Sequence, residues 1–330
     1  MSKGLVLVTG GAGYVGSVVS EYLLKKGFNV RVLDLLIHGE GFEKPLEKYD
    51  NFEFLKGDVR NTLTLERALE NVDFVVHLAA IVGAPESRRI PELTWDINYQ
   101  ATCNLVDIVK REGKIKRFVF ASTCSNYGKC DSADVVTEES QLSPASTYAE
   151  TKVKAEEYIL SKADSSFCPT ICRFSTVYGL SPRMRFDLLV NEFVRDAMFK
   201  RKLEVRENTW RSYVHVEDIA AVINSILTVV GDKICGEVFN VGTANYCKHD
   251  LVNLVSNFIG NVKITYDSDS KDTRNYKVSF DKIESKLNFK PNWFLEDGIE
   301  QIKMFLEKTD IDPYSEKYSN FNSCGKAVGK

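Results

Sequence analysis

The chain has 330 residues, of which 44% are apolar and 27% are charged, and its formal net charge is −3. This composition is typical of a folded soluble protein and excludes a disordered chain. The near-neutral charge argues against a protein that coats nucleic acid, and no apolar run is long enough for a membrane-spanning helix. The N-terminus lacks the apolar core and cleavage site of a secretory signal. We therefore expect a cytoplasmic protein with neither a nucleic-acid nor a membrane partner.

Eight cysteines are scattered along the chain, the last of them Cys324, and none belongs to a CxxC pair. Their spacing gives no support for a zinc site or a thioredoxin-type site. We expect reduced thiols and no bound metal.

Short apolar runs alternate with helix-like segments through the first half of the chain. Strands are predicted at 5–8, 30–33, 52–55, 74–78, 117–121 and 170–174, and helices at 14–26, 93–111 and 148–161. Runs that are apolar throughout, separated by helices, are typical of a parallel sheet covered on both faces. The predicted fold class is α/β, a Rossmann-type doubly wound parallel sheet.

The pattern changes after Gly179, where a polar stretch that contains arginines leads into a predicted helix at 188–199. One more strand is predicted at 238–241, and from about residue 261 the chain is more polar, with short elements. We expect residues 1–175 to form the sheet domain, with a return of the chain near 212–241. Residues 176–211 and 242–330 would form a smaller C-terminal domain that binds substrate.

A glycine-rich segment, TGGAGYVG at 9–16, lies between the first predicted strand and the first predicted helix. Glycines 11, 13 and 16 fit the G-x-G-x-x-G dinucleotide fingerprint, and glycines 10, 13 and 16 fit a G-x-x-G-x-x-G spacing. Glycine allows a tight turn and brings backbone N–H groups and the helix N-terminus close to a pyrophosphate. Asp34 ends the second strand, where it can accept both ribose hydroxyls of adenosine and would repel the 2′-phosphate of NADP. The segment predicts NAD binding, and the alternative is a glycine-rich turn without a ligand.

Motifs at the ends of the later strands extend this pattern. They are GDVR at 57–60, HLAA at 77–80, ST at 122–123, YG at 127–128, YAETK at 148–152, RFSTVYG at 173–179, RSYVHVED at 211–218, FNVG at 239–242 and RNYKVSFD at 274–281. Together they resemble the extended short-chain dehydrogenase/reductase family, which includes nucleotide-sugar epimerases, dehydratases and reductases. The resemblance covers essentially the whole chain. It extends to oxidoreductases and epimerases of surface-polysaccharide synthesis, and the stretch SPRMRFDLLVNEFV and the ending SNFN resemble GDP-heptose-type 4-oxidoreductases in particular.

The resemblance implies which residues contact NAD. They are Gly10, Gly13, Tyr14, Val15, Gly16, Asp34, Leu35, Asp58, Val59, Leu78, Ala79, Ala80, Asn98, Tyr148, Lys152 and Ser175. Asn98 has an alternative interpretation as a polar helix residue that faces solvent. Ser175 departs from the pattern, because epimerases often carry an aromatic residue at its position.

Tyr148 and Lys152 are four residues apart and therefore share one face of a helix. A tyrosine with its ordinary pKa near 10 is too weakly acidic to act as a base at neutral pH. The Lys152 ammonium and the positive nicotinamide ring both favour the phenolate. Tyr148 could then take the proton of a sugar hydroxyl while hydride leaves for NAD, and Thr123 could hold the same oxygen. By itself, Y-x-x-x-K is usually a solvated helix face.

The resemblance also implies a substrate site for a GDP- or UDP-linked sugar. Its predicted residues are Thr123, Thr176, Arg183, Arg185, Asn191, Arg211 and Arg274. Arg211 and Arg274 match two family arginines that grip the diphosphate, a task that suits the planar guanidinium fork. Thr176 stands where epimerases often have an asparagine.

The segment Thr123-Cys124-Ser125 lacks the acid and base that the family's dehydratases carry after the fifth strand. The sequence therefore predicts reversible oxidation at one sugar carbon, C4, by an epimerase or by a dehydrogenase or reductase. Cys124 could shuttle a proton or could be a small buried thiol. An NAD-sensing regulator and a hydroxysteroid dehydrogenase are the alternatives from other classes. The helices predicted at 93–111 and 148–161 carry apolar residues beyond one face, and we expect them to form a homodimer.

Overall fold

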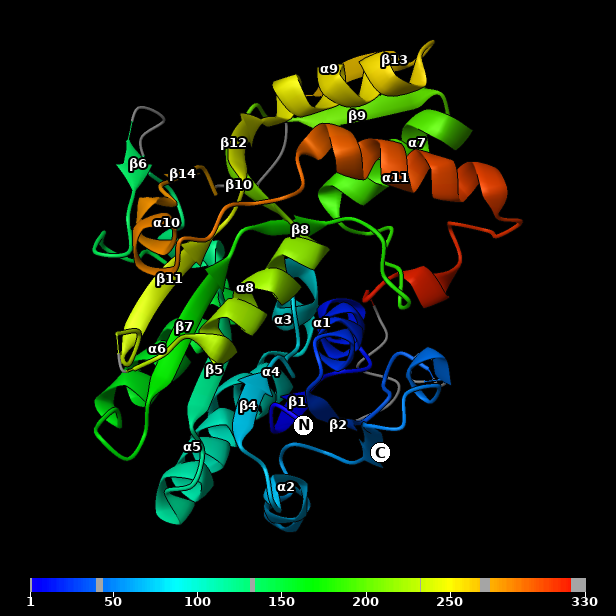
Figure 1. Cartoon of the computed structure of the whole chain (residues 1–330). Helices are drawn as coiled ribbons and strands as arrows, with labels where there is room; N and C mark the ends of the chain where they lie inside the picture. The colour runs from blue at the N-terminus through cyan, green and yellow to red at the C-terminus, as the bar shows by residue number, and fades with distance from the viewer. Residues whose placement is uncertain (1, 40–43, 131–133, 232, 268–273, 322–330) are drawn as a thin grey trace.

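The computed structural model describes residues 2–39, 44–130, 134–231, 233–267 and 274–321. Seven parallel strands form the main sheet, in the order β11-β7-β5-β4-β1-β2-β3 (Figure 1). They are β1 (Leu5–Thr9), β2 (Asn29–Asp34), β3 (Phe52–Lys56), β4 (Phe74–His77), β5 (Arg117–Thr123), β7 (Pro169–Phe174) and β11 (Glu237–Val241). The predicted α/β fold with a doubly wound parallel sheet is confirmed.

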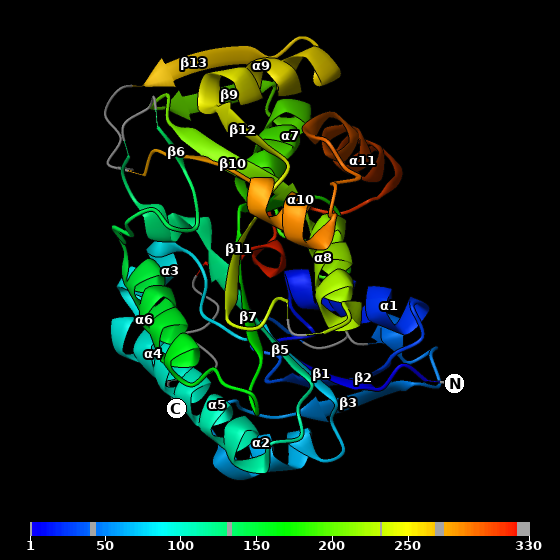
Figure 2. The ribbon, with the colours of Figure 1, turned by 60° about the vertical axis from the view of Figure 1, so that its left-hand side comes forward.

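Helices cover both faces of this sheet, as Figure 2 shows. One face packs against α1 (Tyr14–Lys25) and α8 (Val216–Thr228) in a single apolar core. The other face packs against α2 (Thr62–Leu69), α5 (Ala101–Glu112) and α6 (Thr147–Ser161) in a second core. Because both faces are buried, the inner strands need apolar side chains on both sides, whereas β2 and the edge strand β3 carry the charged residues Arg31 and Glu53.

The predicted long helix at 93–111 is continuous but not uniformly α-helical. It begins with α4 (Pro91–Trp95), passes through a π-helical turn, η2 (Asp96–Gln100), and continues as α5. A short helix, α3 (Ala84–Arg89), precedes it. π-turns are rare and occur mostly at functional sites, and this one lies beside the end of β4.

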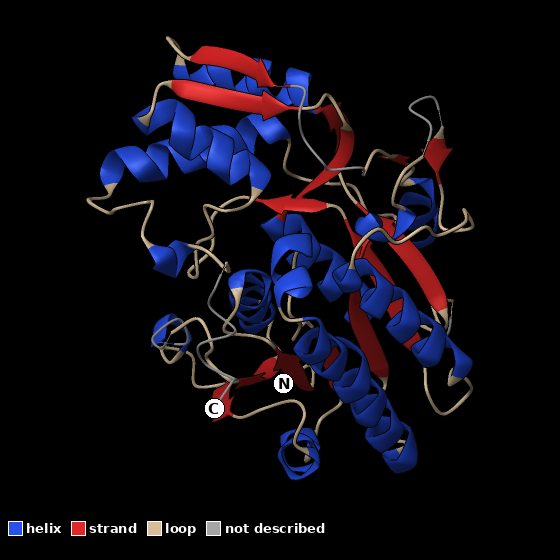
Figure 3. Ribbon diagram, turned by 180° about the vertical axis from the view of Figure 1, so that it is seen from behind, coloured by secondary structure: helices blue, strands red, loops and turns tan. Residues whose placement is uncertain are grey.

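A second group of elements forms its own core beyond the carboxyl edge of the sheet. It comprises the sheet β12-β10-β8 and the parallel pair β13-β9, with helices around them (Figure 3). The bounds are β8 (Thr176–Tyr178), α7 (Leu189–Phe199), β9 (Lys202–Arg206), β10 (Trp210–His215), β12 (Ala244–Cys247), α9 (Lys248–Ile259), β13 (Lys263–Asp267) and α11 (Leu295–Lys308). The smaller elements are η1 (Lys44–Leu46), η3 (Cys124–Tyr127), β6 (Val135–Val136), β14 (Lys277–Val278), α10 (Asp281–Leu287) and η4 (Glu316–Tyr318).

The expectation of only short elements after residue 261 is wrong at α11, which has 14 residues. The side chain of Asp297 accepts the backbone N–H of Phe294, which caps the start of the helix. Leu295, Ile299, Ile302 and Leu306 are buried, and their 4-3-4 spacing places them on one face. The polar residues between them lie on the exposed face, so the average composition of this segment does not reveal the apolar spacing.

Of the helices described, none has the length and apolar character needed to cross a membrane. The described part of the chain also contains no group of three or more His, Cys, Asp or Glu side chains placed to hold a metal. Seven cysteines are free thiols, and Cys324 lies outside the described residues. The division into domains at 1–175, 176–211, 212–241 and 242–330 stays a prediction.

Candidate active site

A pocket of about 310 Å³ lies along the edge of the sheet where the parallel strands end. Ligands of open α/β sheets bind at this edge because the loops after successive strands converge there. The pocket is lined by the segments that follow β1, β2, β3, β4, β5 and β7, together with two residues of α6. Of the residues predicted to contact NAD, 15 line it: Gly10, Gly13, Tyr14, Val15, Gly16, Asp34, Leu35, Asp58, Val59, Leu78, Ala79, Ala80, Tyr148, Lys152 and Ser175.

The glycine-rich loop turns the chain from β1 into α1 at one end of the pocket. Gly10 has a φ of +71°, and a side chain there would strike the backbone of Ala79. A side chain at Gly16 would strike the carbonyl of Gly10. Gly13 precedes α1 without a side-chain cap, so the first N–H groups of the helix face the pocket. This uncapped and close-packed N-terminus fits a pyrophosphate. The three glycines of this loop that line the pocket are Gly10, Gly13 and Gly16, which have the G-x-x-G-x-x-G spacing.

Two carboxylates lie at the same end. Asp34 is oriented by the loops after β1 and β2, because Oδ2 accepts the N–H of Ala12 at 3.0 Å and Oδ1 accepts that of Leu36 at 2.8 Å. Asp58 is held by Arg60, whose Nη2 lies 2.6 Å from Oδ2. The hydrogen bonds from Arg60 oppose the effect of burial and lower the pKa of Asp58. Both groups are therefore fixed anions, as the adenosine end of an NAD site requires.

Asn98 is buried and does not face solvent, so the solvent-facing alternative is wrong. Its amide accepts the N–H of Ile81 at 2.8 Å and donates to the carbonyl of the same residue at 2.9 Å. A second donation reaches Thr151 Oγ1 at 3.2 Å. Asn98 is absent from the described pocket lining, whereas Ile81 is part of it. The geometry gives Asn98 the role of holding the segment after β4 against helix α6.

Thr123, Tyr148 and Lys152 meet at the other end of the pocket. The Thr123 side chain lies beside the Tyr148 phenol and acts on its pKa. Burial nevertheless raises the pKa of Tyr148 to about 12, although the Thr123 side chain and the positive charge of Arg185 both lower it. In the ligand-free protein, Lys152 therefore does not lower the pKa of Tyr148 as expected. A phenolate would need a further positive charge close to the ring.

Lys152 is only 2% exposed, and its ammonium lies 4.5 Å from the centre of the Phe120 ring. Burial lowers the pKa of Lys152 to about 7, and the carboxylate of Glu156 opposes that effect. Within the described residues, the Lys152 ammonium has no hydrogen bond or ion pair. A buried cation in such surroundings is suited to hold polar groups of a bound ligand.

Two of the predicted substrate arginines border the pocket beside the C-terminal segment. Arg185 makes a bidentate pair with Asp187, at 2.9 Å from Nε to Oδ1 and 2.8 Å from Nη2 to Oδ2. Arg183 is buried, and it donates to the carbonyl of Ser319 at 3.3 Å. Asn320 also lines the pocket, although about 135 residues separate it from the two arginines. The motif SNFN, which contains Asn320, was part of the family resemblance, but no place in the site was predicted for this residue.

The other predicted substrate residues lie outside the described pocket lining. Arg211 is buried on β10 and donates to the carbonyls of Trp210 and Arg274, with its guanidinium 5.4 Å from the Tyr276 ring. Asn191 is fully buried, and its amide bonds Gly179 N–H at 3.1 Å and the Arg185 carbonyl at 2.9 Å. These contacts within the protein make Asn191 a support for the arginine-bearing loop. Thr176 lies on β8, paired with β10.

Residues 6–242 match the NAD dependent epimerase/dehydratase family. The chain belongs to this family. It is 32% identical over 311 residues to the uncharacterized UDP-glucose epimerase YtcB of Bacillus subtilis, with 89% of this chain and 95% of that relative covered.

Two solved structures share the architecture. One is dTDP-glucose 4,6-dehydratase of Bacillus anthracis in complex with NAD, with 26% identity, a TM-score of 0.81, and 93% of this chain and 97% of that chain covered. The other is MoeE5 in complex with UDP-glucuronic acid and NAD, with 27% identity, a TM-score of 0.81, and 93% and 100% covered. The chain is an NAD-dependent enzyme of the epimerase/dehydratase type, and the predicted cofactor is confirmed.

The described lining of the pocket has no carboxylate near Tyr148. Among the lining residues that the structure describes, the carboxylates are Asp34 and Asp58, and both lie at the adenosine end. Cys124 is fully buried, with its thiol 3.8 Å from Ser175 Oγ, and burial raises its pKa to about 12. These surroundings favour the interpretation of Cys124 as a buried thiol over that of a proton shuttle.

Proposed function

We propose that this enzyme transfers hydride reversibly between NAD and one carbon, C4, of a nucleotide-linked sugar. The observation that carries the proposal is that Thr123 and Tyr148 line one pocket together with the buried side chain of Lys152. This trio lies at the end of the pocket opposite to Asp34. An alcohol carbon bound there would lie beside both a proton acceptor and the cofactor's reactive ring.

Each residue then has a separate task. The Tyr148 phenolate accepts the proton of the sugar hydroxyl, and Thr123 donates a hydrogen bond that keeps the same oxygen in place. NAD, when bound, supplies the acceptor for the hydride. Lys152 binds the ribose hydroxyls of the cofactor with its ammonium, and its charge also favours the phenolate. In the reverse direction Tyr148 returns the proton to the keto oxygen.

The substrate is a sugar linked to a nucleoside diphosphate, GDP or UDP, and Arg211 and Arg274 bind its diphosphate. Their close approach supports this role, because Arg211 bonds the backbone of Arg274 and brings the two segments together. Arg185 and Arg183 would contribute from the rim of the cofactor pocket. The names of the relatives point to uridine- and thymidine-linked sugars, and MoeE5 was solved with UDP-glucuronic acid. The GDP-heptose likeness stays a prediction.

Epimerisation fits this site better than dehydration does. Loss of water from the sugar needs an acid and a base beside the reacting carbons, and the described lining offers no carboxylate near Tyr148. If the keto sugar turns over before reduction, the product is the C4 epimer. If the keto sugar leaves instead, the enzyme is a nucleotide-sugar 4-dehydrogenase or 4-reductase.

Product analysis tests the proposal directly. We would incubate the protein and NAD with UDP-glucose, UDP-glucuronic acid and a GDP-hexose, and follow the C4 configuration by proton NMR. Tyr148→Phe keeps the ring and removes the base, so kcat is expected to fall by about 10² to 10⁴ with NAD affinity preserved. Near-normal turnover by Tyr148→Phe would disprove the mechanism, and a 4-keto-6-deoxy product would identify a dehydratase instead.

A further inference from the structure

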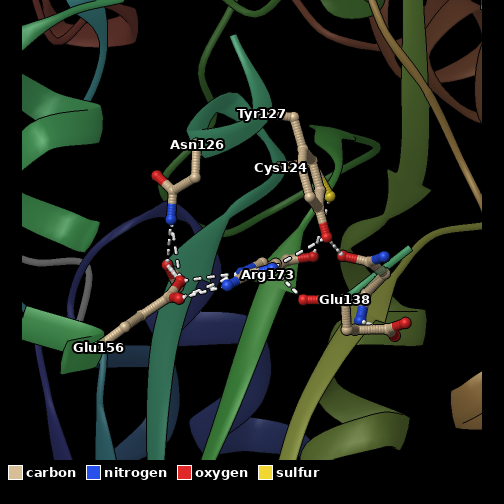
Figure 4. A network of polar contacts seen from close by, with 8 residues as sticks. Cys124, Asn126, Tyr127, Glu138, Glu156 and Arg173 are labelled. Carbon is tan, nitrogen blue, oxygen red and sulfur yellow. Dashed lines mark hydrogen bonds and ion pairs between the residues drawn. The ribbon is translucent and has the colours of Figure 1, made fainter. Parts of the chain in front are cut away.

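A buried network of polar side chains is centred on Glu156 and Arg173 (Figure 4). At its centre is Glu156 on α6, one helical turn beyond Lys152 and only 3% exposed. Its carboxylate pairs with Arg173 of β7, at 2.7 Å from Nη2 to Oε2. The same carboxylate accepts hydrogen bonds from Ser122 Oγ and, at 2.9 Å, from Asn126 Nδ2. Every contact therefore joins α6 to the carboxyl ends of β5 and β7.

The network continues to a third strand. Arg173 Nη1 donates to the hydroxyl of Tyr127 at 3.0 Å and to the carbonyl of Glu138 at 3.2 Å. The Tyr127 hydroxyl donates in turn to Asn240 Oδ1 of β11 at 2.7 Å. Three neighbouring strands, β5, β7 and β11, are thus tied to the helix that carries Tyr148 and Lys152. Ser122, a member of the network, immediately precedes Thr123 in β5.

The groups that face Lys152 leave Glu156 as its counter-charge. On β4, His77 bonds Thr9 and Thr102 through its two ring nitrogens, and burial lowers its pKa to about 3, so it is neutral. On α6, Tyr148 is a neutral phenol in the ligand-free protein. From β5, Phe120 offers only the face of its ring. Among these described neighbours, Glu156 supplies the negative charge, and its carboxylate also pairs with Arg173.

A buried ion pair is a costly way to join a helix to a sheet. Apolar residues of similar volume would join them as well, because the desolvation of two charges offsets much of their attraction. A buried ion pair at this place is explained if the charge of Glu156 has a function of its own. One turn of helix separates Lys152 from Glu156, which is the spacing at which side chains lie on the same face.

We propose that Glu156 is a positioning residue, whose carboxylate is anchored by Arg173 and the end of β5 and serves as the counter-charge of Lys152. The inference rests on the proposed role of Lys152 in the reaction. It assigns a use to a pair whose two members are not among the described residues that line the pocket. The same anchoring fixes the position of α6 relative to Thr123, since Ser122 binds Glu156 directly.

The test measures the ionisation of Lys152 and needs no substrate. Ligand-free protein would be treated briefly with acetic anhydride at a series of pH values, and acetylation of Lys152 quantified by peptide mass spectrometry. Only the neutral amine reacts, so the midpoint of the profile reports the ionisation. In the wild type we expect a midpoint near pH 7. In Glu156→Gln the counter-charge is lost and Arg173 is left uncompensated, so the midpoint is expected to move down by at least about one pH unit, a tenfold change in the ionisation constant.

Two further variants separate charge from general disruption. Tyr127→Phe removes one neutral partner of Arg173 and leaves every charge in place, so the Lys152 midpoint should stay at its wild-type value. Glu156→Asp keeps the charge but withdraws it by one methylene, so a smaller downward shift is expected. Glu156→Asp also replaces Glu156→Gln as the test variant if circular dichroism shows that Glu156→Gln does not fold.

An unchanged midpoint in a folded Glu156→Gln protein would overturn the inference, as would an equal shift in Tyr127→Phe. If Glu156→Gln does not fold, an unshifted Glu156→Asp would overturn it instead. The labelling result does not depend on turnover. Normal turnover by Tyr148→Phe together with the expected labelling shift would therefore refute the proposed function and leave the role of Glu156 as a counter-charge intact.

Discussion

Ionisation of the Tyr148 phenol can be followed without any sugar nucleotide. In the ligand-free protein burial raises the pKa of this phenol to about 12, so at pH 8 roughly one molecule in 10⁴ carries a phenolate. General-base chemistry near neutral pH needs a pKa several pH units lower. Part of the missing stabilisation comes from positive charge that arrives with the bound cofactor.

The size of that effect follows from Coulomb's law. One positive charge about 6 Å from the phenolate contributes about 2.8 kcal/mol at an effective dielectric constant of about 20. At about 1.36 kcal/mol for each pH unit, this charge lowers the pKa of Tyr148 by about two, because it stabilises the anion and not the neutral phenol. The nicotinamide ring carries the charge in oxidised NAD and lacks it in NADH. We therefore expect a pKa of about 10 with oxidised NAD and about 12 with NADH.

The assay is an ultraviolet titration of tyrosinate absorbance, taken as the difference between wild type and Tyr148→Phe. The difference isolates one phenol among 14 tyrosines. At pH 10.5 about three quarters of Tyr148 should be ionised with oxidised NAD, and only about 3% with NADH. Tyr158→Phe is a matched control on the same helix, because its hydroxyl bonds Asp107 far from the cofactor. Identical titrations with the two cofactor forms would refute the electrostatic reasoning.

Other predictions concern the cofactor, the substrate and the assembly. Asp34→Ala should narrow the preference for NAD over NADP in a fluorescence titration, and an unchanged preference would contradict the assigned role. Arg211→Ala should weaken nucleoside diphosphate binding by roughly 10- to 160-fold, corresponding to about 1.5–3 kcal/mol, with calorimetric NAD affinity unchanged. The exposed Arg111→Ala is its control. Partly exposed Trp95, Tyr99 and Tyr158 form an edge-to-face row that suits a twofold interface. Sedimentation should therefore give twice the 37.3 kDa chain mass, and only one chain for Tyr99→Asp.

The sheet and the adenosine end of the pocket could be predicted because their determinants are local. The parallel strands are mostly apolar, although Arg31 interrupts β2 and Glu53 interrupts β3, and the loop from Gly10 to Gly16 needs glycine for reasons that its own backbone imposes. Parallel strands also end at one edge, so residues that follow them in sequence converge in space. Asp34 was predicted from its place at the end of the second strand, and Asp58 and Leu78 were predicted from the family resemblance.

What the sequence could not show depends on partners far along the chain. Asn98 and Asn191 were candidates for ligand contact, yet both amides bond backbone groups that no local pattern reveals. The buried pair of Glu156 and Arg173 was missed for the same reason, since a charged residue in a helix is usually solvated. Asn320 reaches the pocket only because the C-terminal segment packs against the loop of Asp187.

The strand order also has a consequence for how the chain is made. Strand β7 ends at Phe174, and the strand that covers its outer edge, β11, begins at Glu237, with 62 residues between them. At about 5–20 residues per second, a ribosome needs about 3 to 12 s to make that interval, and for that time β7 is an open sheet edge. Helix α8, which completes the core around α1, emerges within the same interval. A fragment that stops at residue 175 would keep that exposed edge permanently, and we expect it to aggregate, whereas one that extends to residue 242 includes both missing elements.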